Sequence, residues 1–253
     1  MMKTLAMKIL LALAITLPLH ARAADIVVLT PPNMKAILAA LAPEFERTSG
    51  HKLVIAYAPA PVVKDKVAAG DTVDVAITLR PLMDELRTQG KLTSVDNVGR
   101  SFIAVAVRAG APKPDISSLD AFKRALIAAQ SIAYSDPPKG GISGVYTAKL
   151  IERLGLTDQL KGKTRLVPPG GGPLVELVAS GGAEIGIDQL SSLVNKPGID
   201  VVGTLPREAD VDIVMAAGVT SNSAQPDAAA ALVKFLSSPA AASVIKARGM
   251  EPG

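Results

Sequence analysis

Residues 26–45, IVVLTPPNMKAILAALAPEF, combine a strand, a turn and a helix in immediate succession. The apolar run 26–29 predicts a buried strand, and apolar residues then recur at helical spacing from Met34 to Phe45 until Gly50 ends the helix. Pro31, Pro32 and Asn33 separate the two elements. In open parallel sheets such a junction lies beyond the carboxyl end of a strand, which is where these folds bind ligands.

The same unit repeats along the chain. Further strands are expected at 52–58, 73–79, 102–107, 131–135, 164–167, 184–187 and 211–217, and helices at 62–69, 81–89, 119–129, 144–154, 174–179, 228–236 and 240–247. The Pro-rich stretch 108–118 interrupts this order as a linker. The pattern predicts an α/β protein with two lobes, each a parallel-rich sheet covered by helices on both faces, whose last segment returns to the first lobe.

The first 24 residues read as a secretory signal peptide. Lys3 and Lys8 precede an apolar run at 9–19, which is too short to span a bilayer, and Ala21 and Ala23 offer a cleavage site before residue 24 or 25. A retained N-terminal anchor is the alternative. Because the chain has no Cys, we expect neither a disulfide framework nor a lipid anchor, and a protein free in the periplasm.

Charge excludes a nucleic-acid partner. Cleavage would reduce the 27 basic residues to 24 and leave all 23 acidic residues, so the net charge falls from +4 to +1. Only seven Phe and Tyr are available for base stacking.

No motif argues for catalysis or for a cofactor. His51 is the only histidine beyond residue 24, which opposes a His-dependent triad or a zinc site, and we expect it in a solvated loop. The tripeptide at 162–164 lacks the first glycine of a phosphate-binding loop, and the Gly-rich stretches lack dinucleotide spacing. We therefore expect a protein that is not an enzyme and binds no cofactor.

Four junctions between strands and helices carry the candidate site. They are TPPNM (30–34), TLRPL (78–82), PPKGGISGV (137–145) and PPGGGPL (168–174). Asn33 and Ser143 are good helix caps, and Pro81 and Pro173 suit a first helical position. Each helix start presents free N–H groups and a partial positive charge, so their convergence would favour an anion.

Several motifs now resemble the molybdate-binding periplasmic proteins of ABC importers, within the type II periplasmic binding protein superfamily. They are VDVAITL, VKDKVAAGD, SDP, GVYTAKLIERLGL, LVASGGAEIGI and the closing ALVKFLSSPAAASVIKARGMEP, and the likeness extends from residue 25 to the C-terminus.

The resemblance implies two Rossmann-like lobes joined by two crossovers, near Val105 and Pro206. Lobe 1 would comprise 25–105 with 207–253 returning to it, and lobe 2 would comprise 106–206. It also implies a monomer that closes on a small ligand and docks on an ABC permease in the inner membrane. A sensing subunit for a membrane receptor is an alternative role.

The ligand contacts of that family match this chain poorly. Its first loop offers hydroxyl and amide donors where this chain has two prolines, and its later Tyr falls on Gln189. A buried oxyanion with unpaired acceptors costs about 1–3 kcal/mol for each. We therefore expect a small anion, an organic carboxylate rather than molybdate or tungstate, although backbone amides of Gly140, Gly141 and Gly172 could replace lost hydroxyls.

Arg80 is the strongest charged candidate, because it follows a strand end and could form a fork of donors to a carboxylate. Pairing with a neighbouring acid is the alternative, and Lys139 is expected to be solvated. The expected ligand-binding residues are Thr30, Asn33, Ala60, Thr78, Arg80, Gly141, Ser143, Gly172 and Gln189.

Overall fold

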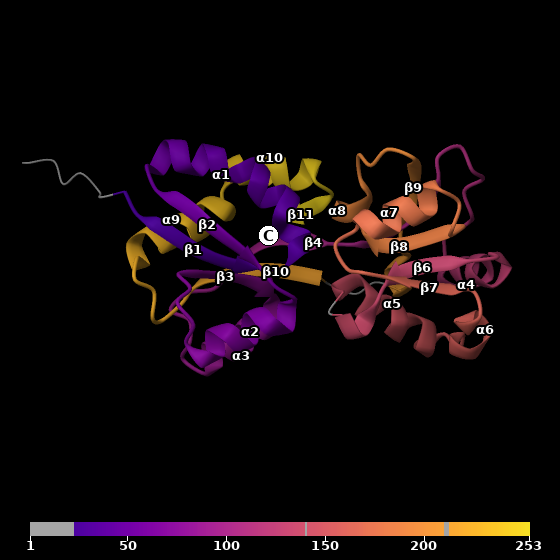
Figure 1. The fold of residues 1–253 in the computed structure, drawn as a ribbon, viewed down its shortest axis with the longest axis horizontal. Coiled ribbons are helices and arrows are strands. Elements are labelled where there is room, and N and C mark those ends of the chain that lie inside the picture. The colour runs from indigo at the N-terminus through magenta and orange to yellow at the C-terminus, as the bar shows by residue number, and fades with distance from the viewer. Residues whose placement is uncertain (1–22, 140, 210–212) are drawn as a thin grey trace, which may run out of the picture.

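The computed structural model describes residues 23–139, 141–209 and 213–253, and this part contains two β-sheets flanked by helices (Figure 1). The expected signal peptide lies outside the described residues apart from Ala23 and Ala24. Gly140 also lies outside them, and so does Val211, which is the first residue of the strand expected at 211–217.

The first sheet has six strands in the order β11-β4-β10-β3-β1-β2. Their bounds are β1 Asp25–Thr30, β2 Lys52–Tyr57, β3 Val75–Leu79, β4 Asp96–Ser101, β10 Ile213–Val219 and β11 Met250–Pro252. One face carries α1 (Lys35–Ser49), α9 (Pro226–Leu236) and α10 (Pro239–Ala247), and the other carries α2 (Ala60–Ala69) and α3 (Arg80–Thr88) (Figure 1). The short helix η1 (Pro32–Met34) joins β1 to α1.

The second sheet has five strands in the order β7-β6-β8-β5-β9. The strands are β5 Ile103–Arg108, β6 Ile132–Ser135, β7 Thr164–Val167, β8 Ile185–Gln189 and β9 Ile199–Thr204. The helices of this lobe are α4 Leu119–Ala128, α5 Ile142–Arg153, α6 Thr157–Lys161, α7 Gly172–Ala179 and α8 Leu190–Leu193, with short helices η2 Pro137–Lys139 and η3 Arg207–Ala209.

The chain crosses between the sheets twice. It leaves the first sheet at Ser101 and enters the second at Ile103, so Val105, the expected crossover, is inside β5. It returns between Thr204 and Ile213, a segment that includes Pro206.

Both sheets are mixed rather than wholly parallel. β1 pairs in parallel with β2 and β3, but β10 is antiparallel to β3 and β4; β5 is antiparallel to β8 and β9. The strands next to the crossovers run against their neighbours because they enter each sheet from the other lobe. Strands β4, β9 and β11 and helices α6 and α8 were not predicted; β4 (DNVGRS), for example, contains little apolar sequence.

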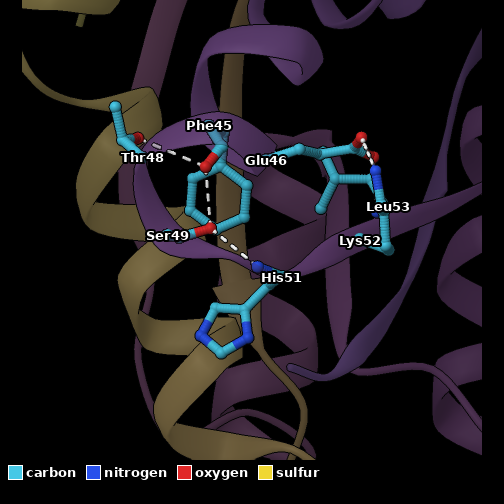
Figure 2. A network of polar contacts seen from close by, with 7 residues as sticks. All are labelled: Phe45, Glu46, Thr48, Ser49, His51, Lys52 and Leu53. Carbon is cyan, nitrogen blue, oxygen red and sulfur yellow. Dashed lines mark hydrogen bonds and ion pairs between the residues drawn. The ribbon is translucent and has the colours of Figure 1, made fainter. Parts of the chain in front are cut away.

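The end of α1 is fastened to the start of β2. Gly50 takes the left-handed conformation with φ 75°, which a glycine adopts without strain. Glu46 bridges the two elements: its carboxylate accepts a hydrogen bond from the Leu53 amide at 2.9 Å and pairs with Lys52 at 3.0 Å (Figure 2). The Leu53 amide and then the Lys52 ammonium lower the pKa of Glu46.

His51 differs from its expected place in a solvated loop. It is half-buried, and its Nδ1 accepts a hydrogen bond from the Ala24 amide at 3.2 Å. Its ring lies 6.4 Å from that of Phe45. The residue therefore helps to fix the chain where β1 begins.

A buried carboxylate, Asp74, joins the first sheet to α9. One of its oxygens accepts the Val27 amide at 2.8 Å, and the other accepts the Ser223 hydroxyl at 2.7 Å and the Ala224 and Gln225 amides at 2.9 and 3.2 Å. Four donors satisfy the buried charge, as such groups require.

Within the described ranges, no individual helix has the length and apolar character needed to cross a bilayer, although α9 and α10 reach that threshold when taken together across a 58° bend. Both helices bury apolar side chains against the first lobe, including Leu232, Leu236 and Ile245.

Candidate ligand-binding site

A small cavity of about 30 Å³ lies where residues of the two lobes meet. A space of this size has room for a water molecule or two. The lining residues are Pro31, Pro32 and Asn33 from the first lobe and Ser135, Gly141, Ile142, Ser143, Pro169, Gly170, Asp188, Gln189 and Ser192 from the second. None of these lining side chains is a cation, and Asp188 is the one carboxyl among them.

The first lobe contributes the loop after β1. Pro31 is extended, with φ −71° and ψ 155°, and neither proline supplies an N–H donor. Asn33 lies inside η1 and makes no side-chain cap, contrary to expectation. Instead its Nδ2 donates to Gln189 Oε1 at 2.9 Å, while its buried Oδ1 has no partner in the described chain. The double proline thus directs one amide side chain across to the second lobe.

Gln189 receives that contact at the end of β8. Its side chain is buried, and Oε1 also accepts the Ser101 hydroxyl at 3.3 Å. Ser101 closes β4 of the first sheet, immediately before the crossover at Phe102. One side-chain oxygen therefore links both lobes beside the cavity and the crossover.

The start of α5 forms a wall of the cavity. Gly141 precedes the helix and no side chain caps it, so its first N–H groups are free of intrahelical partners. The Ser143 hydroxyl lies 3.4 Å from that of Ser135, at the end of β6. Ser143 is the second residue of α5 and not its cap, which corrects the expectation. A free helix start of this length attracts negative charge.

Gly144 brings this helix unusually close to β6. A Cβ atom added there would lie 1.8 Å from the Ser135 carbonyl oxygen and 2.6 Å from its carbonyl carbon. Any other residue would push the helix start away from the strand. The glycine therefore fixes the position of the free N–H groups relative to Ser135.

Asp188, which the sequence analysis missed, is the most unusual group in the lining. It is buried at the end of β8, and Oδ1 accepts the Gln189 amide at 2.7 Å. Oδ2 has no hydrogen-bond partner within the described ranges. Burial raises the pKa of the carboxyl, and the Ser143 hydroxyl and the Gln189 amide oppose part of that increase. The available signal was an acid within the apolar strand IGIDQ, directly before a helix.

Four of the nine expected site residues line the cavity: Asn33, Gly141, Ser143 and Gln189. Thr30 and Thr78 are buried near the ends of the neighbouring strands β1 and β3 and are not in the lining. The Thr30 Oγ1 atom has no partner among the described residues, whereas Thr78 Oγ1 lies 3.4 Å from the Ala60 carbonyl. The Gly172 amide donates to Gly170 O at 3.0 Å, and Gly172 itself is not among the lining residues.

Arg80 is not in the lining. Its Nε lies 3.0 Å from both carboxylate oxygens of Asp84, and its Nη1 donates to Asn97 Oδ1 at 2.9 Å. These contacts hold the guanidinium within the first lobe. Arg80 therefore pairs with a neighbouring acid, which was the alternative to ligand binding. Lys139 pairs with Asp136 at 3.4 Å and is largely exposed.

Comparison with known proteins places this geometry in a family. Residues 26–251 match the model of a bacterial extracellular solute-binding protein. The chain belongs to that family. The motif resemblance is thereby confirmed for family and fold.

One relative and two solved structures are similar to this chain. An aconitate isomerase of Pseudomonas sp. is 38% identical over 233 residues, which cover 89% of this chain and 87% of that protein. The substrate-binding domain of a molybdenum ABC transporter from Clostridium difficile superposes with a TM-score of 0.75 at 20% identity, over 91% of this chain and all of that one. The Azotobacter vinelandii periplasmic molybdate-binding protein superposes with a TM-score of 0.72 at 23% identity, over 90% of this chain and 99% of that one. At these identities, the two structures establish the fold and not the ligand.

Proposed function

We propose that this solute-binding protein captures a small organic carboxylate in the cavity between its lobes, as the periplasmic binding subunit of an ABC importer. The observation that supports this most directly is the free start of α5 facing neutral polar groups of both lobes. The named activity of the 38% identical relative concerns a tricarboxylate, which agrees with this ligand class. In this role the protein acts as a monomer and without a cofactor.

Molybdate suits the lining less well. Pro31 and Pro32 lack the N–H groups that a fully ionised tetrahedral oxyanion needs, and Asn33 already donates to Gln189. An organic acid can place its apolar carbon skeleton against Pro31, Pro32 and Ile142 while one carboxylate meets the start of α5.

A thermal-shift panel tests the proposal. Molybdate, tungstate, sulfate and small mono-, di- and tricarboxylates are each added to the purified protein. A ligand at a hundred times its dissociation constant stabilises the folded state by about 2.7 kcal/mol. Stabilisation by carboxylates alone supports the proposal, whereas stabilisation by molybdate alone refutes it.

Variants of the contact between the lobes locate the ligand. Asn33→Ala and Gln189→Ala remove the two sides of the 2.9 Å hydrogen bond and are expected to weaken binding of the best carboxylate at least tenfold. The matched control is Asn222→Ala, because Asn222 bonds the Gly70 carbonyl outside the cavity lining. Equal affinities in all three variants would mean that the ligand binds outside this cavity.

A second candidate function is isomerisation of an unsaturated carboxylic acid. Two observations favour it: the relative named aconitate isomerase, and the buried Asp188 carboxyl in the lining. Both candidates require the same cavity and ligand class, and they differ in whether the bound molecule leaves unchanged.

A further inference from the structure

Asp188 has no structural task that explains its burial. The other buried carboxylate described above, Asp74, accepts four hydrogen bonds and joins β1 to α9. Asp188 Oδ1 accepts the amide of the next residue, and Oδ2 has no partner among the described residues. A buried polar atom left in this state destabilises the folded protein, so its retention in a ligand cavity calls for a functional reason.

The groups around Asp188 suit proton transfer. A carboxyl whose pKa is raised by burial is a stronger base when ionised and a usable acid when protonated. Ser143, whose hydroxyl opposes part of the increase in the pKa of Asp188, belongs to α5, and the first N–H groups of that helix lie on the same wall of the cavity. Base and stabilising dipole therefore come from the ends of two neighbouring elements, β8 and α5.

We propose that Asp188 is a catalytic residue that moves a proton along the allylic unit of an unsaturated polycarboxylic acid bound in this cavity. This inference rests on the proposed binding of an organic carboxylate. It gives the protein an activity in addition to capture.

The reaction needs no co-reactant. The ionised Asp188 carboxylate takes a proton from the methylene carbon next to the double bond; the C–H bond breaks, an O–H bond forms, and the electron pair spreads over the allylic carbons and their conjugated carboxylate. Asp188 then returns the proton to the other end of the allylic unit, and the double bond re-forms between the central carbon and the former methylene carbon. The conformation about that former single bond when the proton was removed decides whether the product is cis or trans, so the two isomers interconvert.

The start of α5 has a defined part in this sequence. Negative charge grows on the conjugated carboxylate during proton removal, and preorganised N–H donors stabilise such charge more strongly than water does. Ser135 and Ser143 hydroxyls lie beside these donors. The arrangement stabilises the intermediate more than the bound substrate, which is the requirement for catalysis.

The test follows cis- and trans-aconitate with the purified protein by proton NMR. Wild type is expected to interconvert the isomers. Asp188→Asn keeps the side-chain shape but cannot accept the proton, so we expect the turnover rate to fall at least about 100-fold while the dissociation constant changes only a few-fold. The matched control is Asp200→Asn in β9, whose carboxylate bonds the Gly110 amide outside the cavity lining and whose turnover should equal that of wild type.

The outcomes separate the two proposals. Binding of aconitate without isomerisation by wild type, or unchanged turnover in Asp188→Asn, overturns the role of Asp188 and leaves carboxylate capture intact. Failure of every carboxylate to bind overturns the proposed function itself. Thermal melting monitors folding; if Asp188→Asn does not fold, Asp188→Ala supplies the second variant, and a folded Asp188→Ala protein with wild-type turnover equally refutes the inference.

Discussion

Gly144→Ala is expected to damage both stability and ligand binding through a single methyl group. The added Cβ would lie 1.8 Å from the Ser135 carbonyl oxygen, whereas ordinary contacts begin near 3.4 Å. The start of α5 must therefore move about 1.6 Å from β6, and forcing an extra methyl group into a packed site costs roughly 1–3 kcal/mol. The movement also displaces the free N–H groups, so we expect at least a tenfold weaker affinity for the best carboxylate.

Urea unfolding measures the first effect and calorimetric titration the second. Gly162→Ala is the matched control, because Gly162 has a helical φ of −71° and a Cβ there meets no atom within 4 Å. We expect the control to keep wild-type stability and affinity. If Gly144→Ala behaved like Gly162→Ala in both assays, the close approach of α5 to β6 would not position the site.

Three further variants test other contacts. Asp74→Asn places an amide donor opposite the donors that Asp74 accepts, so urea unfolding should show a loss of about 2–3 kcal/mol, against little change in exposed Asp96→Asn. Glu46→Gln should lower the melting temperature at pH 7, because a carboxyl whose pKa is lowered by folding stabilises the fold above its unfolded pKa of 4.5. This contribution is lost as the pH falls, so the difference between variant and wild type should shrink below pH 4.5. An equal difference at pH 3 would contradict the prediction. Arg80→Ala should cost at most about 1 kcal/mol of stability and leave ligand affinity within twofold, and a tenfold loss of affinity would mean that Arg80 contacts the ligand.

Local patterns predicted most of the elements. Helices such as α1 and α9 show apolar periodicity and end at glycine or serine, and strands such as β1 and β8 are short apolar runs, so both were predictable. Strand β4 was not, because its pairing with β10 and β11 comes from distant segments and its own residues are mostly polar.

The residues of the site were likewise predictable only in part. Asn33, Ser143 and Gln189 lie at junctions that topology makes important, so the position of the cavity could be predicted. Arg80 could not be assigned, because its ion pair with Asp84 one helical turn away competes with any ligand. Asp188 was overlooked because its importance depends on burial and on an unpaired oxygen, and neither is visible in a sequence.

The order of strands in the first sheet has a consequence for how the protein is made. Strand β10 lies between β3 and β4, so the first sheet is split into two pieces until residues 213–219 have arrived. The second sheet takes all of its strands from 103–204. As the chain emerges from a ribosome or an export channel, the lobe in the middle of the sequence can close first, and the lobe that begins the sequence is completed last.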